Sequence, residues 1–229
     1  MIFAGIQKSS LVDYPGLISC VLFVPGCNFN CFYCHNRALF DGPHELLDAN
    51  GIWNFLQKRT GLLDAVVVTG GEPTLQSGLI ETLLKLKSMG YRVKLDTNGS
   101  HPEAVAEVLK QNAADYFAVD YKAPAARYAE FCGEAAAPAN VKETIGLLLK
   151  SGIAFEVRTT VIPQLTQTDL MAMAKELPKV PRWSLNRYRV PEKYRPCDEA
   201  RIQATPYTQG QIDAFAKEMT SPQPNMVIH

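Results

Sequence analysis

The sequence of 229 residues predicts an α/β fold: an open, partial (β/α)6 barrel, related to a TIM barrel and built on a parallel sheet. Six short apolar segments alternate with six segments of helical periodicity, and the connections are long enough for right-handed crossovers. No repeat, charge block or low-complexity linker interrupts the alternation. We therefore expect one domain over residues 1–229, with a core at about 15–190 and a C-terminal helix and tail at about 191–229. Periodicity alone also allows a flavodoxin-like doubly wound sheet.

The expected strands are short runs rich in Val, Ile, Leu and Phe, bounded by turn residues. They lie at 18–24, 65–69, 91–95, 116–119, 155–161 and 183–189. Residues 9–16 precede them as a turn-rich lead-in, because the pair Pro15-Gly16 favours a tight reversal.

The expected helices carry apolar residues at helical spacing. They lie at 46–58, 79–89, 102–110, 141–150, 168–177 and 209–217. Leu83, Leu84 and Leu86 are expected to face inward, Gly90 ends their helix, and Pro102 stands in a first turn, where proline is tolerated.

Composition narrows the class of protein. The formal net charge is zero, which argues against binding of nucleic acid by electrostatic attraction to the phosphates. The N-terminus lacks the pattern of a secretory leader, and no run of about 18 apolar residues predicts a membrane span. We therefore expect a cytoplasmic protein. Because that compartment is reducing, its six cysteines are expected to bind metal or to be buried as thiols, and not to form disulfides. Basic residues concentrate within 182–201, which predicts either a solvated face or a rim for an acidic partner.

Three cysteines lie within eight residues: Cys27, Cys31 and Cys34, in an Asn-rich loop after the first expected strand. Soft thiolates select zinc, copper(I) or iron-sulfur clusters. With His35 they could form a Cys3His zinc site, although no second pair of ligands stands at the usual larger separation. Alternatively, three thiolates could hold a four-iron cluster and leave one iron open. Three unrelated core cysteines are a third interpretation.

The remaining cysteines give no second cluster. Cys20 reads as a strand residue, and Cys132 and Cys197 stand alone in the sequence.

Further polar motifs follow the expected strands, at the end where barrels of this kind carry function. Gly70-Gly71 would let backbone approach a ligand closely, and Glu72 could accept a hydrogen bond from a ligand amine; a plain turn is the alternative. Asp96, Thr97 and Asn98 suit ribose hydroxyls or a hard cation, unless they form an Asx turn.

Two more candidates follow on the next strands. Asp120 and Lys122 would face the same side, as ligand contacts or as an ion pair. Arg158 lies within an apolar strand, where a buried guanidinium is costly without an anion beside it. This favours an interaction of Arg158 with a ligand carboxylate. Because all these motifs fall at one end of the strands, we expect them to form one site.

Together, the motifs resemble those of a known family. Cys-x3-Cys-x2-Cys with Tyr33 before the last Cys, followed by Gly70-Gly71-Glu72-Pro73, resembles radical S-adenosylmethionine (SAM) enzymes. With Val12-Asp13-Tyr14-Pro15-Gly16, Cys34-His35-Asn36, Asp96-Thr97-Asn98-Gly99 and Asp120-Tyr121-Lys122, the chain resembles the glycyl-radical-enzyme activating proteins over about 5–190. The resemblance is greatest to anaerobic ribonucleoside-triphosphate reductase activating proteins, with pyruvate formate-lyase activating enzyme as a relative.

This resemblance implies a set of site residues. Cys27, Cys31 and Cys34 would ligate a [4Fe-4S] cluster, Tyr33 would pack near the adenine of SAM, and Glu72 would meet the methionine amine. Gly70, Gly71, Asn98, Lys122 and Arg158 would lie around SAM, and Asp96, Thr97 and Asp120 would resemble a monovalent-cation site.

The resemblance also implies a reaction and partners. Reductive cleavage of SAM, with the electron from flavodoxin or ferredoxin, would generate a glycyl radical on a partner enzyme, and no side chain would act as a general base. Tyr14 departs from the family, since its relatives usually have Gly in this segment, which would face the partner's glycine loop. A radical SAM enzyme acting on a small molecule, such as 7-carboxy-7-deazaguanine synthase, and a non-catalytic zinc-binding module are the alternatives.

Overall fold

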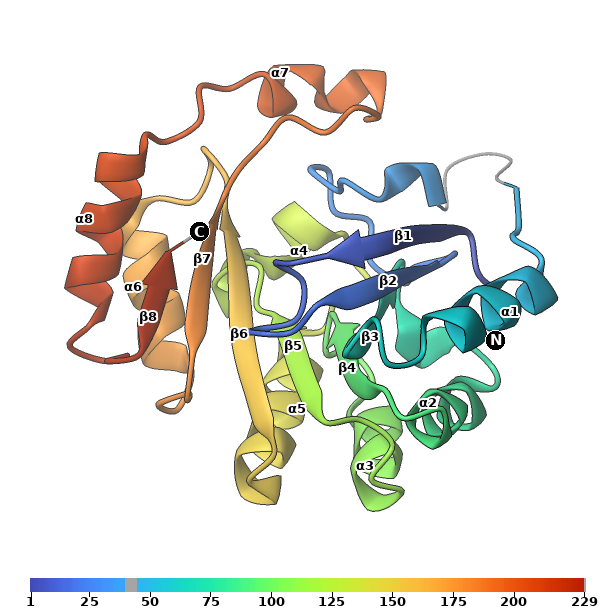
Figure 1. Cartoon of the computed structure of the whole chain (residues 1–229). Helices are drawn as coiled ribbons and strands as arrows, with labels where there is room; N and C mark the ends of the chain where they lie inside the picture. Colours follow the sequence, from blue (N-terminus) through green and yellow to red (C-terminus); the bar gives the residue numbers. More distant parts are fainter. Residues whose placement is uncertain (40–44, 229) are drawn as a thin grey trace. The chain divides into compact units, whose positions relative to one another are not determined.

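The computed structural model describes residues 1–39 and 45–228, and it confirms the α/β class (Figure 1). Eight strands form one sheet in which the order of strands follows the order of the chain. Their bounds are β1 Gly5–Ser10, β2 Ser19–Val24, β3 Ala65–Gly70, β4 Arg92–Thr97, β5 Tyr116–Asp120, β6 Ala154–Val161, β7 Trp183–Arg187 and β8 Met226–Ile228. The pairs β2–β3, β3–β4, β6–β7 and β7–β8 are parallel, whereas β1 runs antiparallel to β2.

The six predicted strands are confirmed as β2 to β7, and the sequence analysis missed β1 and β8. Strand β1 is largely exposed and lies at one end of the sheet order, so it needs no apolar run. Strand β8 has three half-buried residues, too few for a periodic signal. The last predicted strand ends at Arg187, two residues earlier than expected.

The predicted helices are also present; the helix predicted at 102–110 has those bounds, and the others have shifted ends. The helices are α1 Ala49–Arg59, α2 Leu79–Ser88, α3 Pro102–Lys110, α4 Tyr128–Cys132, α5 Pro138–Ser151, α6 Gln167–Glu176, α7 Glu199–Ile202 and α8 Gln209–Met219. The 3-10 turns are η1 Arg37–Leu39, η2 Pro73–Leu75, η3 Ala125–Arg127 and η4 Pro196–Asp198. The short helices α4 and α7 were not predicted, because four or five residues carry no periodicity.

Two details of the helix predictions are wrong. Helix α1 begins at Ala49 and not at 46, because the Asp48 carboxylate caps it by accepting hydrogen bonds from the N–H groups of Asn50 and Gly51. Leu84 was expected to face inward, but it is 38% exposed, whereas Leu83 and Leu86 are fully buried.

The chain forms two compact units. The first comprises 1–28, 38–97 and 101–118 and holds β1–β4 with α1–α3. Strands β2 and β3 are almost entirely buried, as expected for parallel strands covered on both faces. The prediction of one domain over residues 1–229 stays a prediction.

The second unit comprises 29–37, 98–100 and 119–229. Helices α6 and α8 pack together, and α8 lies against β7 and β8 (Figure 1). On β6 and β7, Val157 and Leu185 are fully buried apolar residues, whereas their neighbours Glu156 and Ser184 are buried polar ones. One face of these strands therefore belongs to the core, and the alternate face carries polar groups.

No helix in the described ranges is both long enough and apolar enough to cross a membrane.

Candidate cofactor site

In the first unit, Glu72 is the most constrained of the predicted site residues. It follows β3, its exposed fraction is 0%, and it caps the short turn η2. Its Oε1 atom accepts hydrogen bonds from the Thr74 N–H at 3.1 Å, the Thr74 hydroxyl at 2.6 Å and the Thr97 hydroxyl at 2.7 Å. A buried carboxylate with this many donors is held in one orientation.

Backbone geometry requires glycine at both position 70 and position 71, which the sequence pattern alone did not indicate. Gly70 has φ +116°, and a Cβ on Gly71 would lie 1.8 Å from the carbonyl oxygen of Gly26. That same oxygen accepts the Glu72 N–H at 2.7 Å. The close backbone approach predicted for a ligand is therefore made, within this unit, to the segment directly before Cys27.

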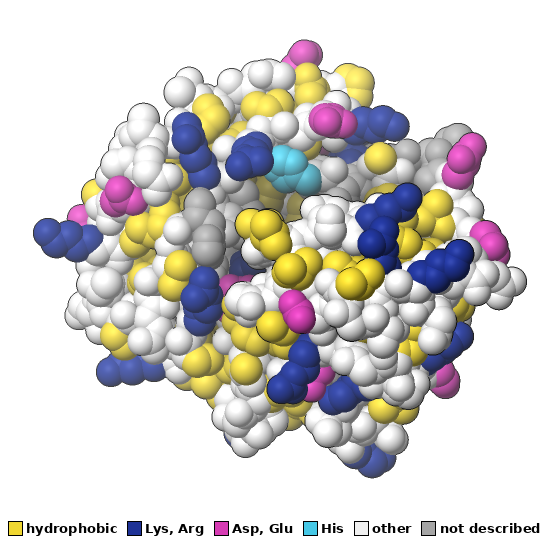
Figure 2. All heavy atoms as spheres, in the orientation of Figure 1, with side chains coloured by type: hydrophobic (Ala, Val, Ile, Leu, Met, Phe, Trp, Pro, Cys, Tyr) yellow, Lys and Arg dark blue, Asp and Glu magenta, His cyan; other side chains and the backbone are white. Residues whose placement is uncertain are grey.

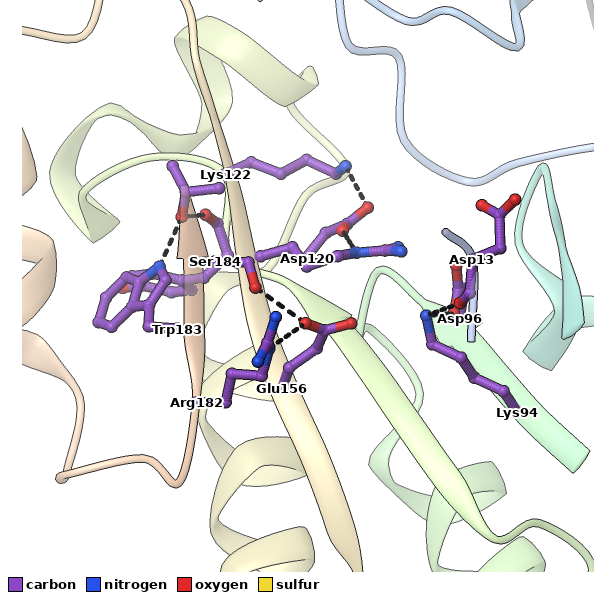
Figure 3. A network of polar contacts seen from close by, with 12 residues as sticks. Asp13, Lys94, Asp96, Asp120, Lys122, Glu156, Arg182, Trp183 and Ser184 are labelled. Atoms are coloured by element: carbon purple, nitrogen blue, oxygen red, sulfur yellow. Dashed lines mark hydrogen bonds and ion pairs between the residues drawn. The ribbon is translucent and has the colours of Figure 1, made fainter. Parts of the chain in front are cut away.

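Asp96 and Thr97 end β4, and both are buried. The Lys94 ammonium lies 3.3 Å from the Asp96 carboxylate and donates to the Asp13 carbonyl at 2.6 Å (Figure 3). Thr97 donates its hydroxyl to Glu72. The two predicted cation ligands of this unit therefore already interact with side chains of the chain itself: Asp96 with the Lys94 ammonium and Thr97 with the Glu72 carboxylate.

In the second unit, Asn98 forms the Asx turn that was the alternative for this residue. Its side-chain oxygen accepts the Ser100 N–H at 2.9 Å. The turn is fastened further by the Thr144 hydroxyl, which donates to the Gly99 carbonyl at 2.8 Å.

The cysteine segment of this unit is an irregular loop, as predicted, and other elements hold its backbone. Arg37 is buried and donates to the Cys31 carbonyl at 2.6 Å and to the Asn30 side-chain oxygen at 3.1 Å. The C-terminus of α4 provides a second anchor, since the Asn30 N–H donates to the Cys132 carbonyl at 2.8 Å. The loop is thereby shaped by the protein before any cofactor is considered.

None of the three cysteines of the motif is in a disulfide, and their surroundings differ. Cys31 is buried, Cys34 is half-buried, and Cys27, in the first unit, is half-buried. A hydrogen bond with Cys132 is the largest influence on Cys31 and lowers the pKa of its thiol to about 7. Burial raises the pKa of Cys34. The effect of Cys132 on the Cys31 thiol has no signal in the sequence, because residues 31 and 132 meet only through the packing of α4.

Tyr33 and His35 flank the last cysteine. The Tyr33 hydroxyl is buried and has no hydrogen-bond partner in the part of the chain that the structure describes. Burial is the main reason that the pKa of Tyr33 is raised well above its ordinary value. His35, the fourth ligand in the zinc alternative, is exposed and hydrogen bonds to the backbone of Arg189.

Asp120, Lys122 and Arg158 form one ion-pair network, of which Asp120 and Lys122 are labelled in Figure 3. The Lys122 ammonium lies 2.9 Å from one Asp120 oxygen, and the Arg158 Nε donates to the other at 3.0 Å. Burial opposes ionisation of Asp120, but the two cations outweigh it and lower the pKa of its carboxyl to about 2. The anion that Arg158 was predicted to require is thus supplied by the chain itself.

The donor set fits a thiolate-bound cluster and a SAM molecule. None of Cys27, Cys31 and Cys34 is in a disulfide, and the lowered pKa of Cys31, about 7, favours the thiolate that a cluster ligand must be. Glu72 is a buried carboxylate, and the buried Tyr33 hydroxyl has no hydrogen-bond partner among the described residues. Among the described residues no three His, Cys, Asp or Glu side chains are grouped as a preformed metal site.

Comparison with known proteins identifies the family. Residues 21–177 match the Radical SAM superfamily. A protein of Methanocaldococcus jannaschii, named as a glycyl-radical enzyme activating enzyme, is 34% identical over 197 residues, which cover 83% of this chain and 81% of that protein. The chain belongs to the radical SAM superfamily. It is a radical SAM enzyme, and this decides against the zinc-binding module.

A second relative of this radical SAM enzyme matches a shorter stretch. The 7-carboxy-7-deazaguanine synthase of Clostridium acetobutylicum is 37% identical over 113 residues, which cover 48% of this chain and 49% of that protein. This chain therefore matches about half of that relative's length.

Solved radical SAM structures share the fold. Streptococcus suis SuiB bound to S-adenosylmethionine superposes with a TM-score of 0.67 at 14% identity, covering 91% of this chain and 51% of SuiB. TYW1 with a lysine-pyruvate adduct gives 0.60 at 16% identity, covering 89% and 72%. These likenesses confirm the partial barrel. The sequential strand order also argues against a flavodoxin-like sheet, in which the order reverses.

Proposed function

We propose that this radical SAM enzyme is an activase that generates a glycyl radical on a partner enzyme, with an anaerobic ribonucleoside-triphosphate reductase as the partner. One observation carries the proposal: the match to the named activating enzyme spans most of both chains. The motifs Asp13-Tyr14-Pro15-Gly16 and Cys34-His35-Asn36 favour the same class.

The lead-in segment supports a protein partner. Tyr14 is buried and packs against Tyr116, with ring centroids 5.7 Å apart. The preceding Leu11 and Val12 are 76% and 86% exposed. The departure at Tyr14 therefore alters the core of the first unit, while two exposed apolar residues remain for a partner to cover.

Cys27, Cys31 and Cys34 are the proposed ligands of a [4Fe-4S] cluster. When bound, the cluster and SAM supply the radical chemistry, and the protein supplies binding, orientation and exclusion of water. Arg37 and the end of α4 shape the loop, and Cys132 keeps the Cys31 thiol easily deprotonated.

Charged and polar side chains are proposed to bind SAM. Glu72 takes the amine, Tyr33 lies near the adenine, and Lys122 with Arg158 meets the carboxylate. Because Asp120 orients both cations, it would position them even where it does not touch SAM. Gly70, Gly71, Asp96, Thr97 and Asn98 complete the proposed surroundings.

A monovalent cation at Asp96, Thr97 and Asp120 remains a proposal. Asp96 pairs with Lys94, and Asp120 pairs with Lys122. An alkali ion would therefore have to displace, or share a carboxylate with, an ammonium of the chain. Oxygen ligands of this kind suit hard cations.

Flavodoxin or ferredoxin is the proposed electron donor, and the cytoplasm the proposed location. The described cysteines form no disulfides, which is the usual state in a reducing compartment.

The decisive experiment reconstitutes the cluster anaerobically, adds reductant and SAM, and supplies a glycyl-radical protein encoded beside this chain's gene. We expect an iron-sulfur absorption band, release of 5′-deoxyadenosine, and the electron paramagnetic resonance doublet of a glycyl radical on the partner. Cleavage of SAM with no radical on any such partner would contradict the activase proposal.

A small-molecule function has one specific observation in its favour, the 113-residue match to 7-carboxy-7-deazaguanine synthase. The deazapurine product of that enzyme gives a direct test. Formation of 7-carboxy-7-deazaguanine by the reconstituted protein would favour this candidate over the activase.

A further inference from the structure

We infer that Thr74 and His101 are positioning residues that hold Glu72 in the orientation for the SAM amine. Nothing in the family motif assigns them this role. The inference rests on the proposed SAM contact of Glu72, but not on the identity of the partner enzyme.

The first step is the saturation of one carboxylate oxygen. Glu72 Oε1 accepts three hydrogen bonds, two from Thr74 and one from Thr97. A carboxylate oxygen has about two lone-pair sites, so a fourth donor has little room at Oε1. The donors on Oε1 therefore decide the orientation in which the Glu72 carboxylate is presented to a ligand ammonium.

The Thr74 hydroxyl links Glu72 to His101, and the direction of each hydrogen bond follows from its single proton. Thr74 has one hydroxyl proton, and at 2.6 Å it is donated to Glu72. The His101 Nδ1 lies 3.3 Å from the same hydroxyl oxygen. Since the proton of Thr74 is already used, the hydrogen bond must run from the His101 Nδ1–H to the Thr74 oxygen. His101 thus fixes the direction in which Thr74 donates.

The third step is the location of the three residues. Glu72 and Thr74 lie at η2, directly after β3, and His101 stands directly before α3, which follows β4. The chain of hydrogen bonds therefore ties the Glu72 turn to the segment after the neighbouring strand, within the first unit. Glu72 is fully buried, so its carboxylate oxygens depend on such donors to replace the hydrogen bonds lost from water.

The test measures ligand affinity in the cluster-loaded protein. Thr74→Val removes the hydroxyl and keeps the side-chain shape. We expect the dissociation constant of SAM to rise about tenfold or more, the usual effect of losing a hydrogen bond to a buried charge. The dissociation constant of 5′-methylthioadenosine, which lacks the amine and carboxylate, should stay unchanged.

Two matched variants serve as controls. Thr74→Ser keeps the hydroxyl and should bind SAM nearly as tightly as the parent. Thr60→Val removes a hydroxyl that donates to the Leu56 carbonyl at the end of α1, and it should leave SAM affinity unchanged.

A double-mutant cycle tests whether His101 acts through Thr74. His101→Phe should weaken SAM binding, and His101→Asn, whose amide N–H can replace Nδ1–H, should restore it. In the Thr74→Val background, His101→Phe should have no further effect. Additive losses, equal losses for SAM and 5′-methylthioadenosine, or unchanged SAM affinity in Thr74→Val would each overturn the inference. Because these binding measurements need no partner protein, a failure here is distinct from a missing glycyl radical.

Discussion

Substitution of Gly71 tests how the glycine pair determines the site. An added Cβ would lie 1.8 Å from the Gly26 carbonyl oxygen and 2.6 Å from the Gly26 carbonyl carbon. A carbon and an oxygen ordinarily approach to about 3.3 Å, so in Gly71→Ala the two backbone segments must separate by roughly 1.5 Å. Both neighbours are backbone, and no side chain can rotate away to relieve the clash.

Two effects of Gly71→Ala follow from this separation. Overpacking costs about 1–3 kcal/mol, which corresponds to a fall in melting temperature of about 2–12 °C for a chain of this size. The hydrogen bond of 2.7 Å from the Glu72 N–H to the Gly26 carbonyl must also lengthen, which moves Glu72. A misplacement of about 1 Å costs roughly 100-fold in rate, so SAM cleavage should fall by that order.

The matched control is Gly146→Ala. Gly146 lies inside α5, and a Cβ there meets nothing within 4 Å. Alanine favours helix by up to about 1 kcal/mol over glycine, so this variant should melt at the same or a higher temperature and cleave SAM normally. Thermal unfolding and 5′-deoxyadenosine release measure both effects. A Gly71→Ala protein with the parent's melting temperature and cleavage rate would refute the reasoning.

Three further predictions concern the ligands, the cation and the partner surface. Replacement of Cys27, Cys31 or Cys34 by Ala should abolish iron binding, whereas Cys197→Ala should keep it. Cys132→Ala should also bind iron, but more slowly at neutral than at alkaline pH. The reason is that the pKa of Cys31 rises from about 7 toward its ordinary 9.0 when the hydrogen bond from Cys132 is lost. Iron loss in Cys197→Ala would show misassigned ligands. If an alkali cation is bound, SAM cleavage should differ between sodium and potassium, and Asp120→Ala should erase that difference; equal rates in the parent would count against the cation. Replacement of the exposed Arg187, Arg189 and Lys193 by Glu should slow glycyl-radical formation at low ionic strength while SAM cleavage persists, and an unchanged salt response would mark a solvated face.

The choice of residues in the last variant comes from the structure. The Arg195 guanidinium lies 2.7 Å from the buried Asp198, so its reversal would disturb folding as well as charge. Basic side chains on the visible face are spread out and do not merge into one continuous patch (Figure 2). Because salt screens exposed charges, a steering effect should be sought at low ionic strength.

The sequence by itself determined the alternation of strands and helices, the cysteine loop and the family. Periodicity identified the six strands β2–β7, since buried parallel strands are continuous apolar runs. The spacing of Cys27, Cys31 and Cys34, together with the residues after the strands, carried the resemblance to radical SAM enzymes, which the comparisons confirmed. These features are local, and a local pattern can be read from consecutive residues.

Only the tertiary structure decided which groups meet. Arg158 reaches Asp120 from a different strand, Cys132 reaches Cys31 from α4, and His101 reaches Thr74 from the segment before α3. Such pairs depend on strand register and on how closely two backbones approach, as at Gly71 and Gly26. Edge strand β1 was missed for a related reason: its stability comes from pairing with β2 and not from apolar residues of its own. Contacts between distant residues are fixed by packing, and packing leaves no periodic trace in the sequence.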